Sequence, residues 1–438
     1  MDDIYLPPME RRLQERYIKL VKGHMHHSSR SAAGLTAVLD QAKGFAATQA
    51  AWRFLNNPRV TLAALAEPLR QAGRAALDGD KAPVALLIHD WCKLGYGAHR
   101  SKRDVVQLTH EHDRGYELAT TLLVSAADGS PLAPMQIHLK TADGLHSTEV
   151  AAPSADIAHI DQVLPTMEAS GSWGLPKPLV HVIDREADSV DHYRQWDQAG
   201  QLFLVRADNR RVNWRGESKL LSEVIKAVTE QETLTVGRSV EYKNRPAFQQ
   251  VTETMVTLDR PGKKRVGGRQ RQVSGRPLDL RLIVSRIVDA EGKALATWML
   301  LTNVQAKDAD AASIALWYYW RWRIESFFKL LKSQGQEIEH WQQENGAAIA
   351  RRLLVAIMAC VVVWQLQRQS SPQAQELKTL LVRLSGRQMK RRVPHTASSL
   401  LAGLFVLLPM LTLIDEYDGN LQNIKQLALR TMPLLRPG

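Results

Sequence analysis

The sequence predicts an α/β fold whose core strands are interrupted by a β-rich insertion and flanked by helical segments at both ends. Three observations support this fold class. Short apolar runs separated by a helical pattern begin at residue 82, and such runs are typical of buried, partly parallel strands. Strand patterns with polar alternation fill residues 207–300. Helical patterns occupy the chain before residue 75 and after residue 308.

The N-terminal helical segment is rich in Ala, Leu, Arg and Gln. Its stretch "AAWRFLNNPRV" (50–60) predicts a helix that ends at an Asn-Asn-Pro stop. The preceding "HMHH" contains His24, His26 and His27, whose spacing does not fit a pair of ligands on one helix face. We therefore expect no metal site in this segment.

The bulk composition indicates a polyanionic partner, because the net charge is +12 and the pI is about 9.7. Nucleic acid and an anionic membrane both fit that charge. The apolar runs 353–366 and 400–414 are shorter than the roughly 18–20 residues that span a bilayer. We therefore expect buried or oligomer-interface helices and no membrane partner. Cys92 and Cys360 are too few for a disulfide framework and the chain shows no secretory signal, which predicts a cytoplasmic protein.

The predicted core contains two apolar runs that each end in an aspartate. "APVALLIHD" ends at Asp90 and "PLVHVID" ends at Asp184. A strand hairpin around an Asp-Gly turn (116–140) and a helical pattern (154–169) lie between them. Either aspartate alone could cap a helix or a turn. Together they indicate a site, because open α/β sheets usually place active sites at the carboxyl ends of their strands.

The β-rich insertion contains a basic stretch, "GKKRVGGRQRQVSGR" (262–276), with no acidic residue. Its glycines suggest a mobile loop. Before it, "VRADNRRVNWR" contains Arg206, Arg210 and Arg211, which fit either phosphate contacts or a solvated cluster at a strand end.

The segment "YYWRWRIESFFKLLK" (318–332) has two distinct faces when drawn as one helix. Tyr318, Arg321, Glu325 and Lys332 fall within an arc of about 60°. The opposite, apolar face holds Trp320, Ile324, Phe327 and Leu331. A salt-bridged surface helix would explain this pattern. So would a catalytic acid among phosphate-binding groups, because three carboxylates from separate elements can hold two Mg²⁺ ions for displacement at phosphorus.

The segment resembles the Tyr-Arg-Glu-Lys signature of the bacterial insertion-sequence DDE transposases, which act by a cut-and-paste pathway. "DREAD" (184–188) is similar to their second-aspartate motif, "LLIHD" (86–90) to their first, and "AAWRFLNNPRV" to their N-terminal DNA-binding segment. Trp91 and Cys92 depart from the Thr or Ser that often follows the first aspartate in the family. The resemblance spans residues from about 10 to 345 in the same order.

The resemblance implies an RNase H-like catalytic core and the following organisation. The expected segments are a DNA-binding domain (1–75), the core (76–206 and 301–345), the insertion (207–300) and a dimerisation region (346–438). Asp90, Asp184 and Glu325 would be the catalytic triad and would bind two Mg²⁺ ions, with Mn²⁺ as a substitute. Trp298 would stack on a flipped base near the cleaved end or, equally, be a core residue. The expected DNA contacts are Tyr318, Arg321, Lys332, Arg185, Arg206, Arg210 and Arg211.

The function predicted from these features is transposition of DNA by a homodimer in a synaptic complex, with water and then a DNA hydroxyl as nucleophiles. Two alternatives stay open at this point. One is an RNase H-like nuclease or junction resolvase without strand transfer. The other is a non-catalytic DNA-binding inhibitor of transposition. In each case the protein would act on nucleoid-associated DNA in the bacterial cytoplasm.

Overall fold

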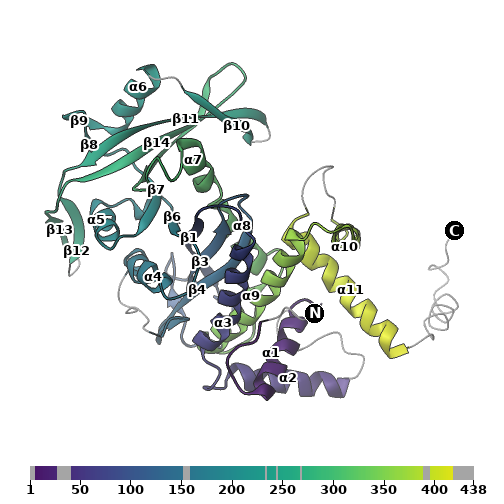
Figure 1. Cartoon of the computed structure of the whole chain (residues 1–438). Coiled ribbons are helices and arrows are strands. Elements are labelled where there is room, and N and C mark those ends of the chain that lie inside the picture. Colours follow the sequence, from purple (N-terminus) through teal and green to yellow (C-terminus); the bar gives the residue numbers. More distant parts are fainter. Residues whose placement is uncertain are drawn as a thin grey trace. The chain divides into compact units, whose positions relative to one another are not determined.

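The computed structural model describes residues 5–26, 41–150, 158–231, 234–242, 245–266, 269–387 and 395–417 (Figure 1). The chain divides into two compact units. The first contains residues 1–68, 95–105 and 329–438, and the second contains residues 69–94 and 106–328. The predicted α/β fold class is confirmed, because the second unit is built on a large mixed sheet with helices packed against it.

The main sheet of the second unit contains 13 strands within the described residues. Along it the strands follow the order β5-β4-β3-β1-β6-β7-β15-β14-β11-β8-β9, with β2 beside β3 and β10 beside β11. Their bounds are β1 (Ala85–Gly95), β2 (Val106–Gln107), β3 (Arg114–Ser125), β4 (Pro131–Thr141), β5 (Gly144–Ser147), β6 (Leu179–Ile183), β7 (Leu202–Arg206), β8 (Arg211–Trp214), β9 (Glu217–Leu220), β10 (Thr235–Tyr242), β11 (Arg245–Leu258), β14 (Leu278–Val288) and β15 (Ala294–Thr302).

Five of these strands form the centre of the sheet in the order β4-β3-β1-β6-β7. β1 pairs in parallel with β6, and β6 pairs in parallel with β7, whereas β3 and β4 form an antiparallel hairpin. This order is consistent with an RNase H-like core. The stretches of β1, β6 and β7 that pair with one another are mostly apolar and buried, as expected for strands covered on both faces.

The insertion continues the same sheet, because β15 pairs with β7 and then with β14. It is richer in strands than in helices, as predicted, but it also contains the helix α6 (Leu221–Gln231), which the strand patterns did not indicate. The stretch expected to be a mobile loop is instead a hairpin of β12 (Gly262–Val266) and β13 (Arg269–Val273) in a separate two-stranded sheet. Side chains of this region and the main sheet share a buried cluster that includes Trp196, Phe203 and Leu282.

Helices cover both faces of the central strands. They are η1 (His159–Gln162), α4 (Val163–Ser170), η2 (Arg185–Ala187), α5 (Val190–Gln198), α7 (Ala311–Tyr319) and α8 (Trp322–Leu331). The predicted single helix over 318–332 is therefore wrong, since two helices meet at Trp320 and Arg321. The amides of Arg321 and Ile324 donate to carbonyls three residues back, and these tighter bonds break the continuous helix.

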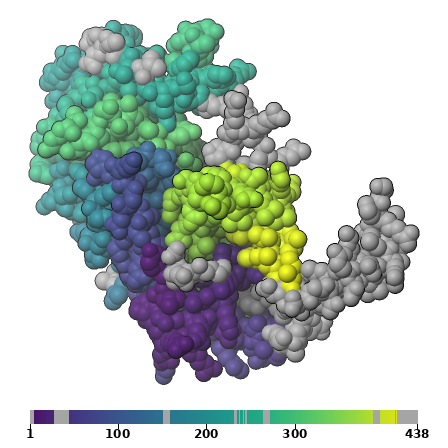
Figure 2. Space-filling view, turned by 45° about the vertical axis from the view of Figure 1, so that its right-hand side comes forward, coloured from purple at the N-terminus to yellow at the C-terminus, as the bar shows by residue number. Residues whose placement is uncertain are grey.

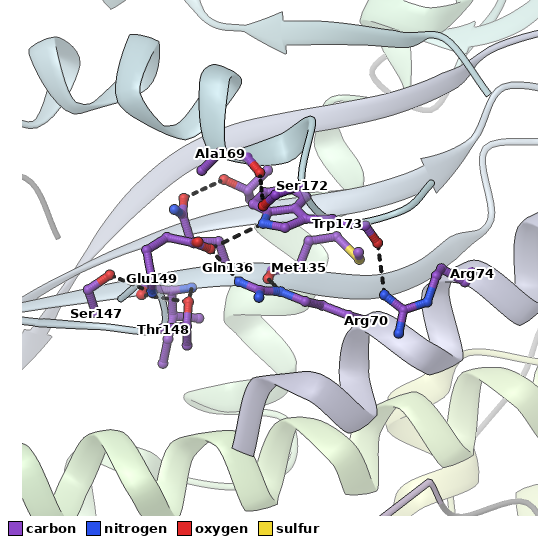
Figure 3. Close-up of polar contacts among 12 residues, drawn as sticks. Arg70, Arg74, Met135, Gln136, Ser147, Thr148, Glu149, Ala169, Ser172 and Trp173 are labelled. Atoms are coloured by element: carbon purple, nitrogen blue, oxygen red, sulfur yellow. Dashed lines mark hydrogen bonds and ion pairs between the residues drawn. The ribbon is translucent and has the colours of Figure 1, made fainter. Parts of the chain in front are cut away.

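A buried ion pair fastens the helix α3 (Leu62–Asp78) to the sheet within the second unit (Figure 3). Arg70 pairs with Glu149 and lies over the ring of Trp173, 5.4 Å from its centroid. The indole N–H of Trp173 donates to Glu149 at 3.2 Å, and Arg74 donates to the Trp173 carbonyl at 2.8 Å. Because each charged group has a partner, the cluster fixes α3 without leaving a bare buried charge.

The first unit is helical and joins two ends of the sequence. Its elements are α1 (Arg11–Gly23), α2 (Gln41–Leu55), the start of α3, η3 (Ile338–His340), α9 (Gly346–Arg368), α10 (Pro372–Leu384) and α11 (Ala397–Tyr417). The N-terminal and C-terminal helices lie side by side, purple against green and yellow in Figure 2. Arg351 of α9 donates to the carbonyls of Val60 and Leu55 at 2.7 and 3.1 Å, which holds the Asn-Asn-Pro stop against α9.

The helix α9 is longer than its apolar run predicted. It begins at Gly346 and has 23 residues, because the Ala-rich stretch before Leu353 continues the helix. By length and composition alone it could cross a membrane, so the argument from a short run does not hold for it. Within the described residues, 83% of its apolar window is buried inside the protein, which is also the property of a core helix.

Candidate active site

The two aspartates lie at the same level of the central sheet. Parallel pairing of β1 with β6 aligns Ile88 with Val182, so that Asp90 and Asp184 each follow two residues after this pair. The sequence predicted Asp90 at the end of its strand. β1 instead continues to Gly95, so Asp90 lies within the strand. Asp184 follows β6 and caps η2, accepting a hydrogen bond from the amide of Glu186 at 2.8 Å. Register therefore brings the two carboxylates to one edge of the parallel pairing.

Arg321 connects the helical junction to the sheet. Its guanidinium contacts Asp90 Oδ2 at 3.1 Å and Glu325 Oε1 at 2.7 Å. The side chains of Arg321 and Asp90 are only 11% and 17% exposed, so solvent screens this pair weakly. The break between α7 and α8 thus places Arg321 and Glu325 beside the first aspartate.

The electrostatics of Asp90 show that the three acids share one environment. Burial raises the pKa of Asp90 to about 6, although Arg321 and the Trp91 amide oppose the rise. The negative charges of Asp184 and Glu325 raise the same pKa further. A carboxylate in this position is stabilised by any nearby cation.

The carboxylate oxygens of Asp90, Asp184 and Glu325 suit a hard divalent cation, since Mg²⁺ and Mn²⁺ prefer such ligands. Geometry adds a condition. Among the residues that the structure describes, no three His, Cys, Asp or Glu side chains converge closely enough to hold a metal ion. Arg321 instead holds Asp90 and Glu325. A divalent ion on these acids would therefore compete with the guanidinium for the same oxygens.

Three further predicted residues lie near this group. Tyr318 is 5% exposed, and burial raises its pKa while the charges of Arg321 and Arg206 oppose the rise. Arg206 ends β7 and thereby comes close to the Tyr318 hydroxyl. Trp298 on β15 is half-buried, and its ring centroid lies 6.5 Å from that of Tyr318. Aromatic and cationic groups are therefore gathered around the acids.

Three of the four remaining predicted DNA contacts have partners of their own within the protein. Arg185 pairs with Asp208 at 3.3 Å on the surface. Arg210 pairs with Asp188 at 2.7 Å and donates to its carbonyl, while Arg211 is exposed at the start of β8. Lys332 follows the end of α8 and belongs to the first unit, where it contacts Glu339 at 2.9 Å.

Sequence reasoning missed His159, which connects the segments that follow both aspartates. Its ring lies 4.1 Å from that of Trp91. Its two nitrogens contact Glu186 at 2.8 Å and Glu117 at 3.3 Å, and these carboxylates raise its pKa. His159 is distant in sequence from all three contacts, so no motif could have indicated it.

Sequence reasoning also missed the contacts made by the turn between β3 and β4. Gly129, with φ of +72°, lies against the indole of Trp320, where a Cβ would stand only 2.4 Å from the ring. The neighbouring Trp317 donates its indole N–H to the Ala126 carbonyl at 3.3 Å. The Asp-Gly signal predicted the turn, but not that the turn supports the junction carrying Arg321.

The opposite face of the central strands carries neutral polar side chains. His89 and His181 share a hydrogen bond of 2.8 Å, and Thr121 contacts the other nitrogen of His89 at 3.3 Å. Thr121 also donates to Gln136 at 3.4 Å. His89, Thr121, Gln136 and His138 line a small cavity of about 20 Å³ together with residues of η1 and α4.

A separate basic cavity lies in the first unit between α1 and α2. Its volume is about 270 Å³, and its walls include Arg12, Arg16, Arg53 and Arg59. Glu10 is its acidic wall residue and lies 3.5 Å from Arg59. The excess of guanidinium groups suits a phosphate or another anion.

Residues 132–362 match the family described as "Transposase DDE domain", which covers more than half of the 438-residue chain. No curated protein matches the sequence. Among solved structures, a piggyBac transposase synaptic complex with hairpin DNA aligns at 9% identity and a TM-score of 0.32, over 75% of this chain and 52% of that chain.

Proposed function

Because the chain belongs to the transposase DDE-domain family, we propose that it is a DNA transposase. It binds the ends of its element, cleaves them by metal-dependent phosphodiester hydrolysis and transfers the 3′ ends to target DNA. The observation that carries this proposal is the grouping of Asp90 and Glu325 around Arg321, with Asp184 in register beside Asp90.

The carboxylates of Asp90, Asp184 and Glu325 would hold two Mg²⁺ ions, or Mn²⁺ in their place. When bound, such ions stabilise charge on a phosphodiester and activate a hydroxyl nucleophile. Members of this family use divalent metals, and the raised pKa of Asp90 gives this chain a physical reason to accept one. Arg321 neutralises Asp90 and Glu325 and would also orient a phosphate.

DNA binding would draw on cations in both units. Near the acids, Tyr318, Arg206 and Arg321 would contact backbone phosphates of the element's end. Arg185, Arg211 and Lys332 would extend these contacts. Arg210 already pairs with Asp188, so substitution of Arg210 should reduce stability before it reduces DNA binding. In the N-terminal helices, the arginine-lined cavity would hold another phosphate and help to fix the register on the duplex.

Trp298 would stack on a base extruded near the cleaved end and make room for a DNA hairpin. Its half-buried position beside Tyr318 supports this role, because part of the indole stays accessible to a base. We propose that Trp298→Ala slows hairpin formation more than first-strand nicking. Unchanged hairpin yield would identify Trp298 as a core residue.

Assembly would be a homodimer through the C-terminal helical region. The helix α11 exposes Val406, Met410, Leu411 and Ile414, each between 39% and 47%, which supports an interface there. The protein would act on nucleoid DNA in the cytoplasm. In this proposal, residues 1–75 would bind DNA, residues 76–206 and 301–345 would form the catalytic core, residues 207–300 the insertion and residues 346–438 the dimerisation region.

The test is cleavage of a duplex carrying the element's terminal inverted repeat in the presence of Mg²⁺. Asp90→Ala, Asp184→Ala and Glu325→Ala should each abolish nicking and preserve binding of the repeat. A variant that cuts at the wild-type rate would remove its residue from the triad. Cleavage without joined products would favour a nuclease, and binding without cleavage by the wild type would favour an inhibitor.

A matched pair tests the lysine of the signature. Lys332→Ala should reduce DNA engagement or cleavage more than Lys329→Ala, which removes the same charge from the end of α8. Equal losses would exclude a specific role for Lys332.

A further inference from the structure

The hairpin of β12 and β13 is a small, strongly basic ribbon on the second unit. Its strands pair only with each other within the described residues, apart from the main sheet. The ribbon has no acidic residue, and its cations are Lys263, Lys264, Arg265, Arg269 and Arg271. Lys263 and Arg271 of this ribbon are exposed. A ribbon with this charge and no acid to offset it suits a polyanionic partner.

The root of this ribbon is fixed to α5. Gly262 lies so close to this helix that a Cβ would stand 3.0 Å from Cβ of Asp191. On the outgoing side, Gly275 lies against Arg194, where a Cβ would stand 2.8 Å from Cδ. Figure 1 shows the two strands beside α5. Glycine at both ends of the hairpin therefore allows close contact with one helix.

Hydrogen bonds strengthen the same attachment. Arg194, which is 8% exposed, donates to the carbonyls of Leu258 and Arg260 at 3.1 and 3.0 Å. Arg276 leaves the ribbon and pairs with Asp197 of α5 at 2.6 Å. The cations at the root are thus used by the fold, whereas Lys263 and Arg271 on the ribbon are exposed. This division separates the cations that fix the root of the ribbon from the exposed cations on its strands.

The helix that carries the ribbon is also close in sequence to the proposed second metal ligand. Asp184 is followed by η2 and then by α5, which begins at Val190. Asp188 joins these elements to the end of β7, because it accepts hydrogen bonds from Tyr193 at 2.6 Å and from the Asp208 amide at 2.7 Å. The ribbon is consequently mounted on the same rigid segment as Asp184.

We propose that the β12–β13 ribbon is a fixed arm that binds the sugar–phosphate backbone of the transposon-end duplex while its scissile phosphate lies at the carboxylates. This inference rests on the proposed function. The ribbon contacts α5, which follows Asp184 closely in the chain. At the first nick the end duplex, and not target DNA, must lie at the carboxylates, so we assign the ribbon to the end duplex. Two-stranded ribbons also have the width to lie in a DNA major groove.

The test compares two double variants with the same loss of charge. Lys263→Gln/Arg271→Gln removes two exposed cations of the arm. Lys293→Gln/Lys307→Gln removes two exposed cations elsewhere in the second unit. Binding of a duplex with the terminal inverted repeat is measured between about 50 and 200 mM salt. Each lost phosphate contact lowers the slope of log K against log salt by about 0.9, so the arm variant should lose about 1.8 and the control close to zero.

The outcomes separate this proposal from the proposed function. Equal slopes for the arm variant and wild type would overturn the arm while leaving end binding intact. Normal end binding with a defect only in joining to target DNA would likewise overturn the assignment to the end duplex. A wild-type protein that neither prefers nor cuts the repeat would instead refute the transposase function. Matching melting temperatures of both double variants exclude unfolding as the cause of a reduced slope.

Discussion

The two faces of the central strand β1 stabilise their buried polar groups differently, one by an ion pair and the other by hydrogen bonds. Alternation along the strand sends Asp90 to one face and its neighbours His89 and Trp91 to the other. On the first face, charged Asp90 is balanced by Arg321 at 3.1 Å. On the second, His89 and His181 are buried as a hydrogen-bonded pair, and burial lowers the pKa of both.

The difference shows how one strand can hold a reactive charge and a stable core together. A buried charge demands a partner, so the first face depends on the helical junction that supplies Arg321. Neutral imidazoles need only hydrogen bonds, and His89 and His181 supply one to each other, so burial of this pair has little electrostatic cost. Substitutions on the charged face should therefore change stability through an unpaired charge, whereas substitutions on the neutral face should change the pH dependence of stability.

Removal of Arg321 should have the largest effect. Arg321→Ala leaves Asp90 buried without its counter-charge, which should lower the free energy of unfolding by about 3 kcal/mol. Asp90→Asn in the same background should restore most of this loss, as chemical denaturation of both variants and the double variant would reveal. Simple additivity of the two substitutions would contradict a direct Arg321–Asp90 coupling.

The second-largest effect should come from Gly129 in the turn between β3 and β4, which packs against Trp320. Gly129→Ala places a Cβ 2.4 Å from the Trp320 ring at a positive φ, so we expect a loss of about 2–3 kcal/mol. Gly292→Ala is the matched control, because Gly292 has φ of +80° and nothing within 4 Å of an added Cβ. If the two variants melt at the same temperature, strain at positive φ and not contact with Trp320 explains the loss.

The neutral face should respond to acid. Burial lowers the pKa of His138 to about 4, whereas an unfolded chain titrates near 6.5. The unfolded state therefore takes up the proton first, and stability should fall as the pH drops from about 6.5 to about 4 and stay constant above. His138→Leu should remove about 2 kcal/mol of the difference between pH 8 and pH 5. An identical pH dependence in both proteins would show that His138 is charged in the fold.

His159 should give the smallest effect and a specific one. His159→Ala removes the stacking on Trp91 and the contacts with Glu117 and Glu186, which should reduce end cleavage by about tenfold with little change in DNA affinity. His159→Arg keeps a cation between the two carboxylates and should recover much of the rate. Failure of Arg to exceed Ala would mean that the charge of His159 has no positioning role.

The sequence predicted the strands that hold the acids because apolar runs of this kind have few structural alternatives. The runs before Asp90 and Asp184 became β1 and β6, and the Asp-Gly turn joined β3 to β4. The carboxyl ends of parallel strands lie at one edge of a sheet, so two such runs bring their terminal aspartates to the same edge. The fold class and the shared edge of Asp90 and Asp184 were therefore predictable from the sequence.

Other parts depend on contacts between distant residues. The helical wheel placed Arg321 and Glu325 on one face, but the break at Trp320 depends on packing against Gly129 in another turn. The contacts of His159 likewise come from three separate segments. Local periodicity carries no information about such contacts, so the sequence could name the members of the site but not how they are held.

The parallel register of β1 and β6 also determines where the chain can lengthen. The level of Asp90 relative to Asp184 is set by pairing that ends at Ile88 and Val182, and it does not depend on the length of any loop. Extra residues in the exposed turn at Gly292 between β14 and β15 would leave that pairing untouched. A fluorescent label or a targeting module inserted there would report on the protein without moving either aspartate.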